Sequence, residues 1–333
     1  MTISNARGVN VFGFVVVCLA AASLVACAPA PASAPSPTPT TAAFLIDRDF
    51  ADPDVVEADG HYVAFAINSR GGNVQFATSE DLTHWQGSLD DALPDLPGWA
   101  TPGRTWAPDV SARTDGDYIM YFVATHAATD RQCIGVATSP TATGPYAPTS
   151  DEPLVCPIEE GGVIDPATFV DDDGVRYLIW KNDGNCCGID TWIHVAPLSP
   201  DGTQLAGAAT RLFTQTESWE GRLVEGPTLV KRGGQYVMFY SANDYGTEEY
   251  AVGVATAPAI TGPYVKRAEP LLSTDATGGQ YIGPGGQDVV TTPGGDVILF
   301  HGWDELFIYR GLHSLPLDWD GAVPSLRLPS TEN

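Results

Sequence analysis

Residues 223–230 read Leu223-Val224-Glu225-Gly226-Pro227-Thr228-Leu229-Val230, which places one carboxylate and a Gly-Pro pair at the head of an apolar run. A turn follows at residues 232–234, and a second apolar run, Tyr236-Val237-Met238-Phe239-Tyr240, comes after it. This pattern predicts a strand, a tight turn and a returning strand. A single acid before a Gly-Pro pair is most simply a solvated turn residue, so the significance of Glu225 depends on whether the unit recurs.

The same unit, an acidic or proline-containing segment that leads into an apolar strand, occurs five times along the chain. Its prolines, at positions 53, 108, 166, 227 and 284, are about 55–61 residues apart. A later strand also repeats, because residues 135–140 and 253–258 both read Gly-Val-Ala-Thr-X-Pro and both are followed by Thr-Gly-Pro-Tyr. The other copies of the unit are Ala51-Asp52-Pro53-Asp54-Val55, Trp106-Ala107-Pro108-Asp109-Val110, Ile164-Asp165-Pro166-Ala167 and, more loosely, Gly283-Pro284-Gly285-Gly286-Gln287-Asp288.

Five units of about 58 residues fill the region from Phe44 to Asn333. One four-stranded antiparallel sheet per unit, arranged radially, predicts an all-β fold, a five-bladed β-propeller over residues 44–333. A long β-sandwich and a β-solenoid are the alternatives. A solenoid needs shorter repeats, and a sandwich does not explain five similar units.

The charge of the chain restricts the classes of partner. The 333 residues include 16 Lys and Arg against 41 Asp and Glu, a net charge of −25. This excess argues against nucleic-acid binding and against docking on anionic lipid by charge. It is compatible with a neutral partner such as a carbohydrate, and we expect the protein to be a monomer.

The N-terminal segment indicates export. Residues 11–25 are almost wholly apolar but short for a membrane span. They lead into Leu24-Val25-Ala26-Cys27, which resembles the lipobox of bacterial lipoproteins. The resemblance implies a signal peptide over residues 1–27, lipidation of Cys27 and membrane contact through that lipid alone. The alternatives are ordinary secretion and an uncleaved anchor. Residues 28–43 are rich in Pro, Ala, Ser and Thr and are expected to form an extended tether.

Four further cysteines, Cys133, Cys156, Cys186 and Cys187, follow the tether. An even number of cysteines outside the cytosol predicts disulfides, although four cysteines allow three pairings. A vicinal Cys186–Cys187 bond would leave Cys133 to pair with Cys156. We hypothesise that such a bond stiffens the loop at residues 182–188 and offers an apolar edge to a sugar. A metal site is less expected, because no second Cys or His cluster has ligand spacing.

Propeller geometry predicts where the acids lie. The first strand of each blade lines the central channel, so Asp52, Asp165 and Glu225 should ring one mouth of it. The loops between second and third strands return to the same mouth and would form a polar pocket with aromatic planes, suited to a sugar ring. These loops carry His126, Asn182, Asn243, Tyr245, His301 and Trp303, while Trp106 and Trp180 could add stacking surface or pack between blades.

Clustered carboxylates raise each other's pKa, and a protonated acid facing an ionised base is the equipment for hydrolysis of a glycosidic bond. Three motifs in chain order, Asp52-Pro53, Ile164-Asp165-Pro166 and Glu225-Gly226-Pro227, resemble the signature of glycoside hydrolase family 43. The resemblance covers nearly all of residues 44–333. It implies a five-bladed propeller and an inverting mechanism that requires no cofactor, with Asp52 as general base, Asp165 as pKa modulator and orienting group, and Glu225 as general acid.

The sequence departs from the family pattern in the fifth unit. Many members carry a His after Gly-Pro-Gly, on the channel axis, where residues 283–287 here end in Gly286-Gln287. The missing His argues against an axial calcium site, although Gln287 or His301 could take its role. Arg310 could contact substrate or form a structural ion pair. Asp54 is interpreted as a turn residue, and Asp109 as a pocket or strand-capping residue.

The resemblance favours one class of substrate without fixing the glycoside. It favours arabinose-containing plant oligosaccharides or polysaccharides, as for an α-L-arabinofuranosidase or arabinanase, with a β-xylosidase as the alternative. A related retaining enzyme of fructosides would need Asn-Asp-Pro, Arg-Asp-Pro and Glu-Cys motifs, which these units lack. A non-catalytic sugar-binding lipoprotein would not need all three carboxylates, so their joint presence favours an enzyme.

Overall fold

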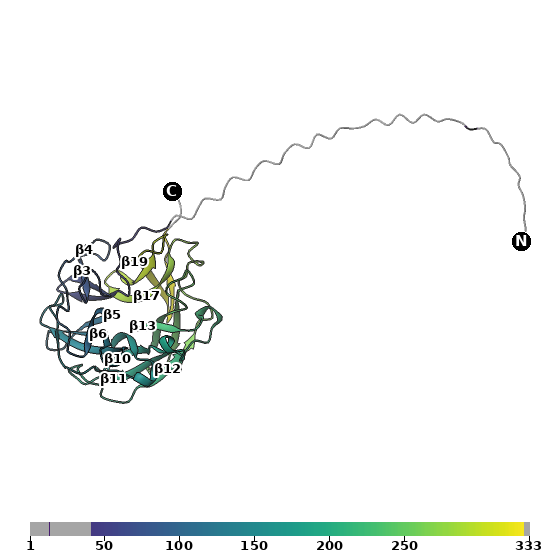
Figure 1. Ribbon diagram of the computed structural model, residues 1–333. Helices are drawn as coiled ribbons and strands as arrows, with labels where there is room; N and C mark the ends of the chain where they lie inside the picture. The colour runs from purple at the N-terminus through teal and green to yellow at the C-terminus, as the bar shows by residue number, and fades with distance from the viewer. Residues whose placement is uncertain (1–12, 14–40, 330–333) are drawn as a thin grey trace, which may run out of the picture. The chain divides into compact units, whose positions relative to one another are not determined.

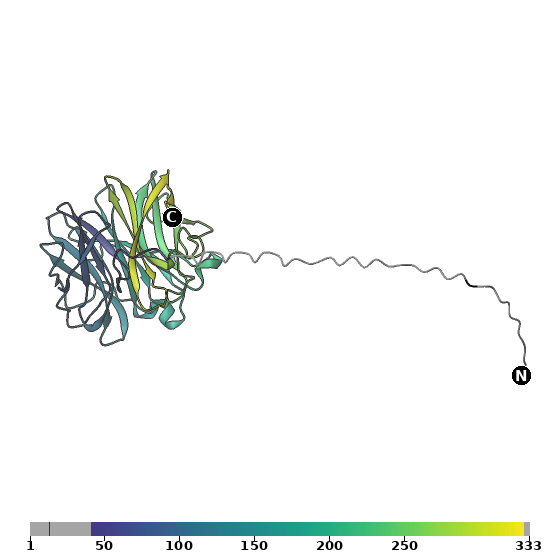
Figure 2. The ribbon, with the colours of Figure 1, turned by 90° about the horizontal axis from the view of Figure 1, so that it is seen from above.

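Five four-stranded antiparallel sheets follow one another along the chain in the computed structural model, which describes residues 13 and 41–329. Figure 1 shows them around a common centre, and Figure 2 shows the same arrangement from above. Within each sheet the strands pair in chain order. The blades comprise β1 Asp54–Ala58, β2 His61–Ala66, β3 Gln75–Ser79 and β4 Trp85–Gly87; β5 Ala100–Ala112, β6 Tyr118–His126, β7 Arg131–Ser139 and β8 Ala147–Pro148; β9 Val163–Val170, β10 Arg176–Asn182, β11 Trp192–Pro197 and β12 Thr210–Thr214; β13 Val224–Arg232, β14 Gln235–Ala242, β15 Ala251–Ala257 and β16 Val265–Lys266; and β17 Ile282–Thr292, β18 Gly295–Trp303, β19 Arg310–Asp320 and β20 Val323–Leu326.

The prediction of a five-bladed β-propeller is confirmed. Helix is confined, among the described residues, to three short 3₁₀ turns, η1 Ile158–Glu160, η2 Gly184–Cys187 and η3 Ser218–Glu220. None of the described helices is long and apolar enough to span a membrane. Apart from Gly13, the expected signal peptide lies outside the described residues, as do Cys27 and all but residues 41–43 of the expected tether.

The repeated glycines of the third strands have a packing cause. A Cβ on Gly135 of β7 would lie 2.4 Å from the ring of Phe122, and a Cβ on Gly253 of β15 would lie 2.5 Å from the ring of Tyr240. Both rings belong to the neighbouring second strand and are fully buried. A side chain at either glycine would displace an aromatic ring from a close-packed core, which accounts for glycine at both positions.

Each blade is one continuous segment, so no strand is shared between the first blade and the last. Instead, residues 45–50 run beside β19, where the amide of Leu45 bonds to the carbonyl of Leu312 (2.8 Å) and the amide of Phe50 bonds to the carbonyl of Arg310 (2.8 Å). We call this pairing the closing seam. It brings the purple first blade against the yellow last blade in Figure 1.

The inner strands share a local distortion at the site end. One residue per blade, in equivalent positions, has a positive φ, and the pairing register shifts beside it in four of the blades. For a residue with a side chain this conformation costs roughly 1–2 kcal/mol, and such strain is typical of functional sites. The five residues are Asp52 (φ 51°), Ala107 (29°), Asp165 (54°), Gly226 (54°) and Gly286 (54°).

Candidate active site

A cavity of about 390 Å³ lies where the inner strands of all five blades meet, a size within the usual range of roughly 300–1,000 Å³ for small-molecule sites. The three acids expected to share one mouth, Asp52, Asp165 and Glu225, all line it. The other polar and aromatic lining residues include Asp54, Trp106, Asp109, Asp183, Asn185, Cys186, Tyr245, Tyr250, Gln287, Asp288 and Arg310.

Asp52 is held in its ionised form by two neighbours. Its Oδ1 lies 3.8 Å from Nη1 of Arg310 and 3.2 Å from Nδ1 of His301, whose side chain is fully buried. Burial alone would raise the pKa of Asp52, but the charge of Arg310 and the contact with His301 outweigh it and lower the pKa to about 2. A Cβ on Gly286 would lie 2.4 Å from Oδ1 of Asp52, so this position accepts only glycine without displacement.

Asp165 has the opposite environment. Burial raises its pKa to about 8, assisted by the negative charge of Glu225 and opposed by Lys181. Its Oδ2 accepts a hydrogen bond from the backbone N–H of Gly226, at 2.9 Å. Asp165 is therefore protonated at neutral pH, while Asp52 in the same cavity is ionised.

Glu225 is buried and has two strong partners. Its Oε2 lies 3.0 Å from Nζ of Lys181, and its Oε1 accepts a hydrogen bond from the Tyr250 hydroxyl at 2.8 Å. The start of β13 is fixed by the Val224 amide, which donates to Oγ1 of Thr191 at 2.9 Å. These contacts hold the Glu225 carboxylate beside Asp165.

Lys181 is the only fully buried lysine among the described residues. Its Nζ also donates to Oδ1 of Asn185 at 2.6 Å and lies 3.8 Å from Oδ1 of Asp183. Burial opposes the charged form, but Glu225, Asp165 and Asp183 outweigh burial and raise the pKa of Lys181. The ammonium is therefore charged and compensated by the acids that surround it.

Three more carboxylates, Asp54, Asp109 and Asp288, line the same cavity. Burial raises the pKa of Asp109 and of Asp288 to about 6, and burial with the charges of the other two acids raises the pKa of Asp54 well above its ordinary value. Each accepts a backbone hydrogen bond from the next blade. The donors are Val110 to Asp54 (2.8 Å), Thr168 to Asp109 (2.8 Å) and Val55 to Asp288 (2.9 Å).

The interpretation of Asp54 as a turn residue is wrong. It is the first residue of β1, and its half-buried carboxylate joins blade 1 to blade 2. Asp109, expected as a pocket or strand-capping residue, lines the cavity and joins blade 2 to blade 3. These acids therefore connect the inner strands of neighbouring blades.

The expected substrate-binding residues divide into two groups. Trp106, Tyr245, Gln287 and Arg310 line the cavity, and the Trp106 and Tyr245 side chains are 36% and 52% exposed. His126, Asn182, His301 and Trp303 lie outside its lining.

The residues of the second group contact neighbouring protein groups instead. His126 contacts Oγ1 of Thr129, and His301 contacts Asp52 from behind the cavity wall. Trp303 donates to the carbonyl of Tyr245 at 2.7 Å, and the Arg310 guanidinium lies over both the Tyr245 and the Trp303 rings, at 5.0 and 5.7 Å. Asn182 supports the loop that carries Asn185 and Cys186.

Sequence reasoning missed Lys181, Asp183 and Tyr250. Lys181 did leave a signal, because it interrupts the apolar strand Tyr177-Leu178-Ile179-Trp180 at a position where a charge must find a partner. Tyr250 left a weaker one, since it directly precedes the repeated third strand that begins at Ala251.

Gln287 of the fifth blade is hydrogen-bonded to two groups of blade 4. Nε2 of Gln287 donates to the carbonyl of Gly226 at 2.6 Å, and its Oε1 accepts from the Ser241 hydroxyl at 2.8 Å. The Gln287 amide, which the sequence offered for the role of an axial His, therefore bonds blade 5 to blade 4. Within residues 41–329, no group of three or more His, Cys, Asp or Glu side chains is arranged to hold a metal ion.

Both cysteine pairs form disulfides. Cys133 of β7 is bonded to Cys156, and Cys186 is bonded to its neighbour Cys187 within η2. Of the three pairings that four cysteines allow, the structure has the one with a vicinal bond. This pairing puts a disulfide at the cavity, because Cys186 lines the cavity.

The model of the family described as Glycosyl hydrolases family 43 matches residues 44–320. A β-D-galactofuranosidase of Aspergillus niger is 30% identical over 272 residues, which cover 76% of this chain and 73% of that protein. An extracellular endo-α-(1→5)-L-arabinanase of Bacillus subtilis is 27% identical over 262 residues, or 69% of this chain, and the chain spans only 53% of that relative's length.

Solved structures agree with the sequence relatives. The crystal structure of a thermostable family-43 glycoside hydrolase superposes with a TM-score of 0.75 and 25% identity, covering 89% of this chain and 96% of that one. That of an endo-1,4-β-xylanase from Bacteroides thetaiotaomicron gives a TM-score of 0.74 and 27% identity, with 87% and 97% coverage.

Proposed function

The chain belongs to glycosyl hydrolase family 43 and is a glycoside hydrolase, and from that membership we propose that it cleaves arabinose- or xylose-containing plant polysaccharides or oligosaccharides with inversion. The observation that carries the proposal is the difference in pKa between two acids of one cavity. The pKa of Asp52 is about 2 and that of Asp165 is about 8. Near neutral pH the cavity therefore holds both an ionised carboxylate and a bound proton, which single-displacement hydrolysis requires.

In the proposed reaction Asp52 is the general base. Its ionised carboxylate removes a proton from a water molecule, which attacks the anomeric carbon. Arg310 and His301 keep Asp52 ionised and fix its direction. His301 is itself favoured as the neutral imidazole, because burial and the nearby Arg310 lower its pKa.

Glu225 is the proposed general acid, and Asp165 the residue that modulates it. Burial and the negative charge of Glu225 keep a proton on Asp165 at neutral pH, and in the proposed step Glu225 takes up this proton and delivers it to the departing oxygen. The hydrogen bond from Gly226 to Asp165 keeps the two carboxylates side by side as the proton leaves. We propose no cofactor, and no step passes through a metal ion.

An α-L-arabinofuranoside or arabinan is the substrate we favour. The B. subtilis relative is named an endo-arabinanase and the A. niger relative a galactofuranosidase, and both names refer to five-membered sugar rings. A β-xyloside is the second candidate, which the likeness to the B. thetaiotaomicron xylanase supports. Trp106 and Tyr245 are the exposed aromatic surfaces proposed to contact the sugar, with Gln287 and Arg310 as polar partners.

Hydrolysis of a substrate panel tests this function. The panel contains aryl arabinofuranoside, xyloside, galactofuranoside, galactopyranoside and fructoside together with arabinan and xylan, and proton NMR follows the first anomer released. We expect turnover of the arabinofuranoside with inverted configuration. Release of the retained anomer would contradict the mechanism. Binding of the sugars without any turnover would favour the non-catalytic alternative.

We further propose that the protein acts outside the cytoplasm as a lipid-anchored monomer. The extracellular relative supports export, and the Leu24-Val25-Ala26-Cys27 sequence supports lipidation of Cys27. Labelled palmitate should be incorporated into the protein in bacteria. The Cys27→Ala protein should instead be released into the medium. Equal labelling of both forms would refute the anchor, and sedimentation of the domain as a dimer would refute the monomer.

A further inference from the structure

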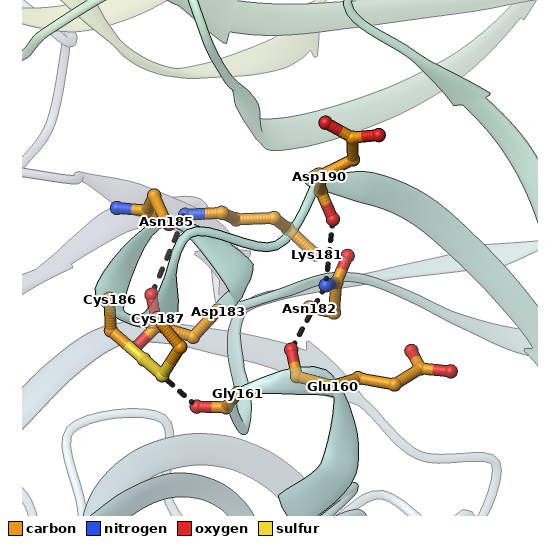
Figure 3. The surroundings of a disulfide bond; sticks show 9 residues. All are labelled: Glu160, Gly161, Lys181, Asn182, Asp183, Asn185, Cys186, Cys187 and Asp190. Atoms are coloured by element: carbon orange, nitrogen blue, oxygen red, sulfur yellow. Dashed lines mark hydrogen bonds and ion pairs between the residues drawn. A yellow bond between two sulfur atoms is a disulfide. The ribbon is translucent and has the colours of Figure 1, made fainter.

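The loop between β10 and β11 is tightly fixed at its base (Figure 3). Nδ2 of Asn182 donates to the carbonyls of Glu160 (3.0 Å) and Asp190 (3.1 Å), and its Oδ1 accepts from the amide of Trp192 (2.7 Å). Asn182 thus ties the start of the loop to its end and to the preceding blade segment. The conformation of the loop's tip is then decided by the residues between, 183–189.

The tip is shaped by the vicinal disulfide. The bond joins Cys186 to Cys187 inside η2, and Sγ of Cys186 lies 3.5 Å from the carbonyl oxygen of Gly161. A bond between adjacent cysteines closes a small ring, which restricts the backbone around it far more than two thiols would. Asn185 directly precedes this ring and lines the cavity. Its side-chain direction therefore depends on the disulfide.

Asn185 connects the disulfide to the proposed acid. Its Oδ1 accepts a hydrogen bond from Nζ of Lys181 at 2.6 Å, and the same Nζ lies 3.0 Å from Oε2 of Glu225 (Figure 3 shows the first contact). The third partner of Lys181 is Asp183, 3.8 Å away. Two of the three partners of a fully buried ammonium thus come from this one loop, and a buried charge takes the position that its partners define.

We propose that the Cys186–Cys187 loop is a positioning element for Glu225, acting through Asn185 and Lys181, and that proton donation at this site depends on the disulfide. The proposal rests on the role of Glu225 as general acid. Reduction by a dithiol transfers two electrons and two protons to the disulfide, which becomes two thiols, while the dithiol becomes its own cyclic disulfide. The freed loop then holds Asn185 less tightly, and Lys181 no longer fixes Glu225 against the departing oxygen.

The different exposure of the two disulfides makes it possible to reduce one of them selectively. Cys186 and Cys187 are exposed, whereas Cys133 is fully buried in the core of blade 2. The native full chain is treated with dithiothreitol, and mass spectrometry of the alkylated protein checks that only Cys186 and Cys187 have become thiols. The kinetic constants kcat and KM are then measured on two substrates of the same sugar, one with a good leaving group and one with a poor leaving group.

We expect reduction to lower kcat roughly tenfold or more on the poor leaving group, with the range of about 10²–10⁴ for complete loss of general acid catalysis as the upper limit, and to change kcat little on the good leaving group. KM should stay within about twofold, and reoxidation should restore kcat. Equal rates before and after reduction on both substrates would overturn the proposal. An equal loss on both would also overturn it, because it would indicate general disruption of the cavity.

Variants separate the loop from the thiols. Cys186→Ser combined with Cys187→Ser should reproduce the leaving-group effect without reductant. Asn185→Ala should reproduce it with the disulfide intact, and Asn185→Asp, which keeps an oxygen acceptor for Lys181, should retain most of the activity on the poor leaving group. The matched control is Cys133→Ala combined with Cys156→Ala, for which any loss should be equal on the two substrates. A wild-type protein without turnover on any sugar would overturn the proposed function as well, whereas turnover insensitive to the loop overturns only this inference.

Discussion

The backbone N–H of Gly226 donates a hydrogen bond to Oδ2 of Asp165, at 2.9 Å, and thereby joins blades 3 and 4 at the residue next to Glu225. Both Asp165 and Gly226 occupy the positive-φ position of their inner strands, which is strained for Asp165. The backbone conformation of Asp165 and this hydrogen bond together fix the Asp165 carboxylate to the residue that follows Glu225. The relation between the proposed modulator and the proposed acid is therefore built into the backbone.

Glu225→Gln should impair substrates with poor leaving groups most. The amide cannot donate a proton to the departing oxygen, and such substrates depend most on that donation. We expect kcat/KM to fall by about 10²–10⁴ on a natural oligosaccharide and far less on an aryl glycoside with an acidic phenol. Equal losses on the two substrates would count against Glu225 as the acid.

Asp52→Asn should abolish turnover on both substrates, because water must be activated whichever group departs. The expected fall in kcat is about 10²–10⁴. Circular dichroism and the melting temperature serve as the check that the fold is retained. Near-normal activity of a folded Asp52→Asn protein would refute its role as base.

Gly286→Ala should reduce activity by displacing the proposed base, although it replaces no reacting group. The new Cβ would lie 2.4 Å from Oδ1 of Asp52 and 2.6 Å from Nδ1 of His301, at a φ of 54°. We expect kcat to fall at least tenfold, because an ångström-scale displacement of a catalytic group costs on the order of 10²-fold. Gly60→Ala is the matched control, since its φ is also positive (78°) but no atom lies within 4 Å of the added Cβ. A Gly286→Ala protein as active as Gly60→Ala would show that Asp52 tolerates the displacement.

Lys181→Met should move the alkaline limb of the pH–rate profile to higher pH. The positive charge of Lys181 lowers the pKa of Asp165, so removal of that charge raises the pKa further and keeps the Asp165 proton bound at higher pH. The other charged groups that face the pair, Asp52, Asp183 and Arg310, are unchanged. Lys231→Met removes a lysine outside the cavity and is the control, for which the profile should not move. A shift toward lower pH after Lys181→Met would contradict this account.

Asp54→Asn should make the protein less sensitive to alkaline pH. Asp54, Asp109 and Asp288 have raised pKa values in the folded state, of about 6 for the latter two. Their contribution to stability is therefore complete below about pH 4, the ordinary Asp value, and is lost as pH rises through the folded-state values. Asn keeps an oxygen that can accept the bond from Val110 but adds no charge.

At pH 8 the Asp54→Asn variant should melt several degrees above wild type, since each kcal/mol is worth roughly 2–4 °C in a chain of this size. At pH 4 the two proteins should melt close together. Thermal denaturation followed by circular dichroism at both pH values measures the difference, with the exposed Asp90→Asn as control. A variant that melts below wild type at pH 8 would show that the Asp54 charge is compensated.

Much of the fold was predictable because the repeats are local and evenly spaced. The prolines from Pro53 to Pro227 mark inner strands, and strands that line one channel must bring Asp52, Asp165 and Glu225 to the same end. The repeated Gly135 and Gly253 were visible as a pattern, although their cause, the rings of the neighbouring strand, was not.

The partners of these acids were less predictable, because they depend on contacts between blades. Asp54 follows Asp52 by two residues and looks like part of the same turn, yet its hydrogen bond goes to Val110 in the next blade. The positions of the expected loops alone also predicted more lining residues than the cavity has. His126 and Asn182 belong to the expected segments, but their polar atoms bond to neighbouring protein groups.

The closing seam has a consequence for how the enzyme would fail on heating. Every other junction between blades continues through the covalent chain, so hydrogen bonds and packing alone hold the ring at residues 45–50 and β19. The seam includes the bond from Phe50 to the carbonyl of Arg310, two residues before Asp52. Opening it would separate Asp52 from the guanidinium that keeps it ionised, so inactivation by heat would begin while the five blades were still intact.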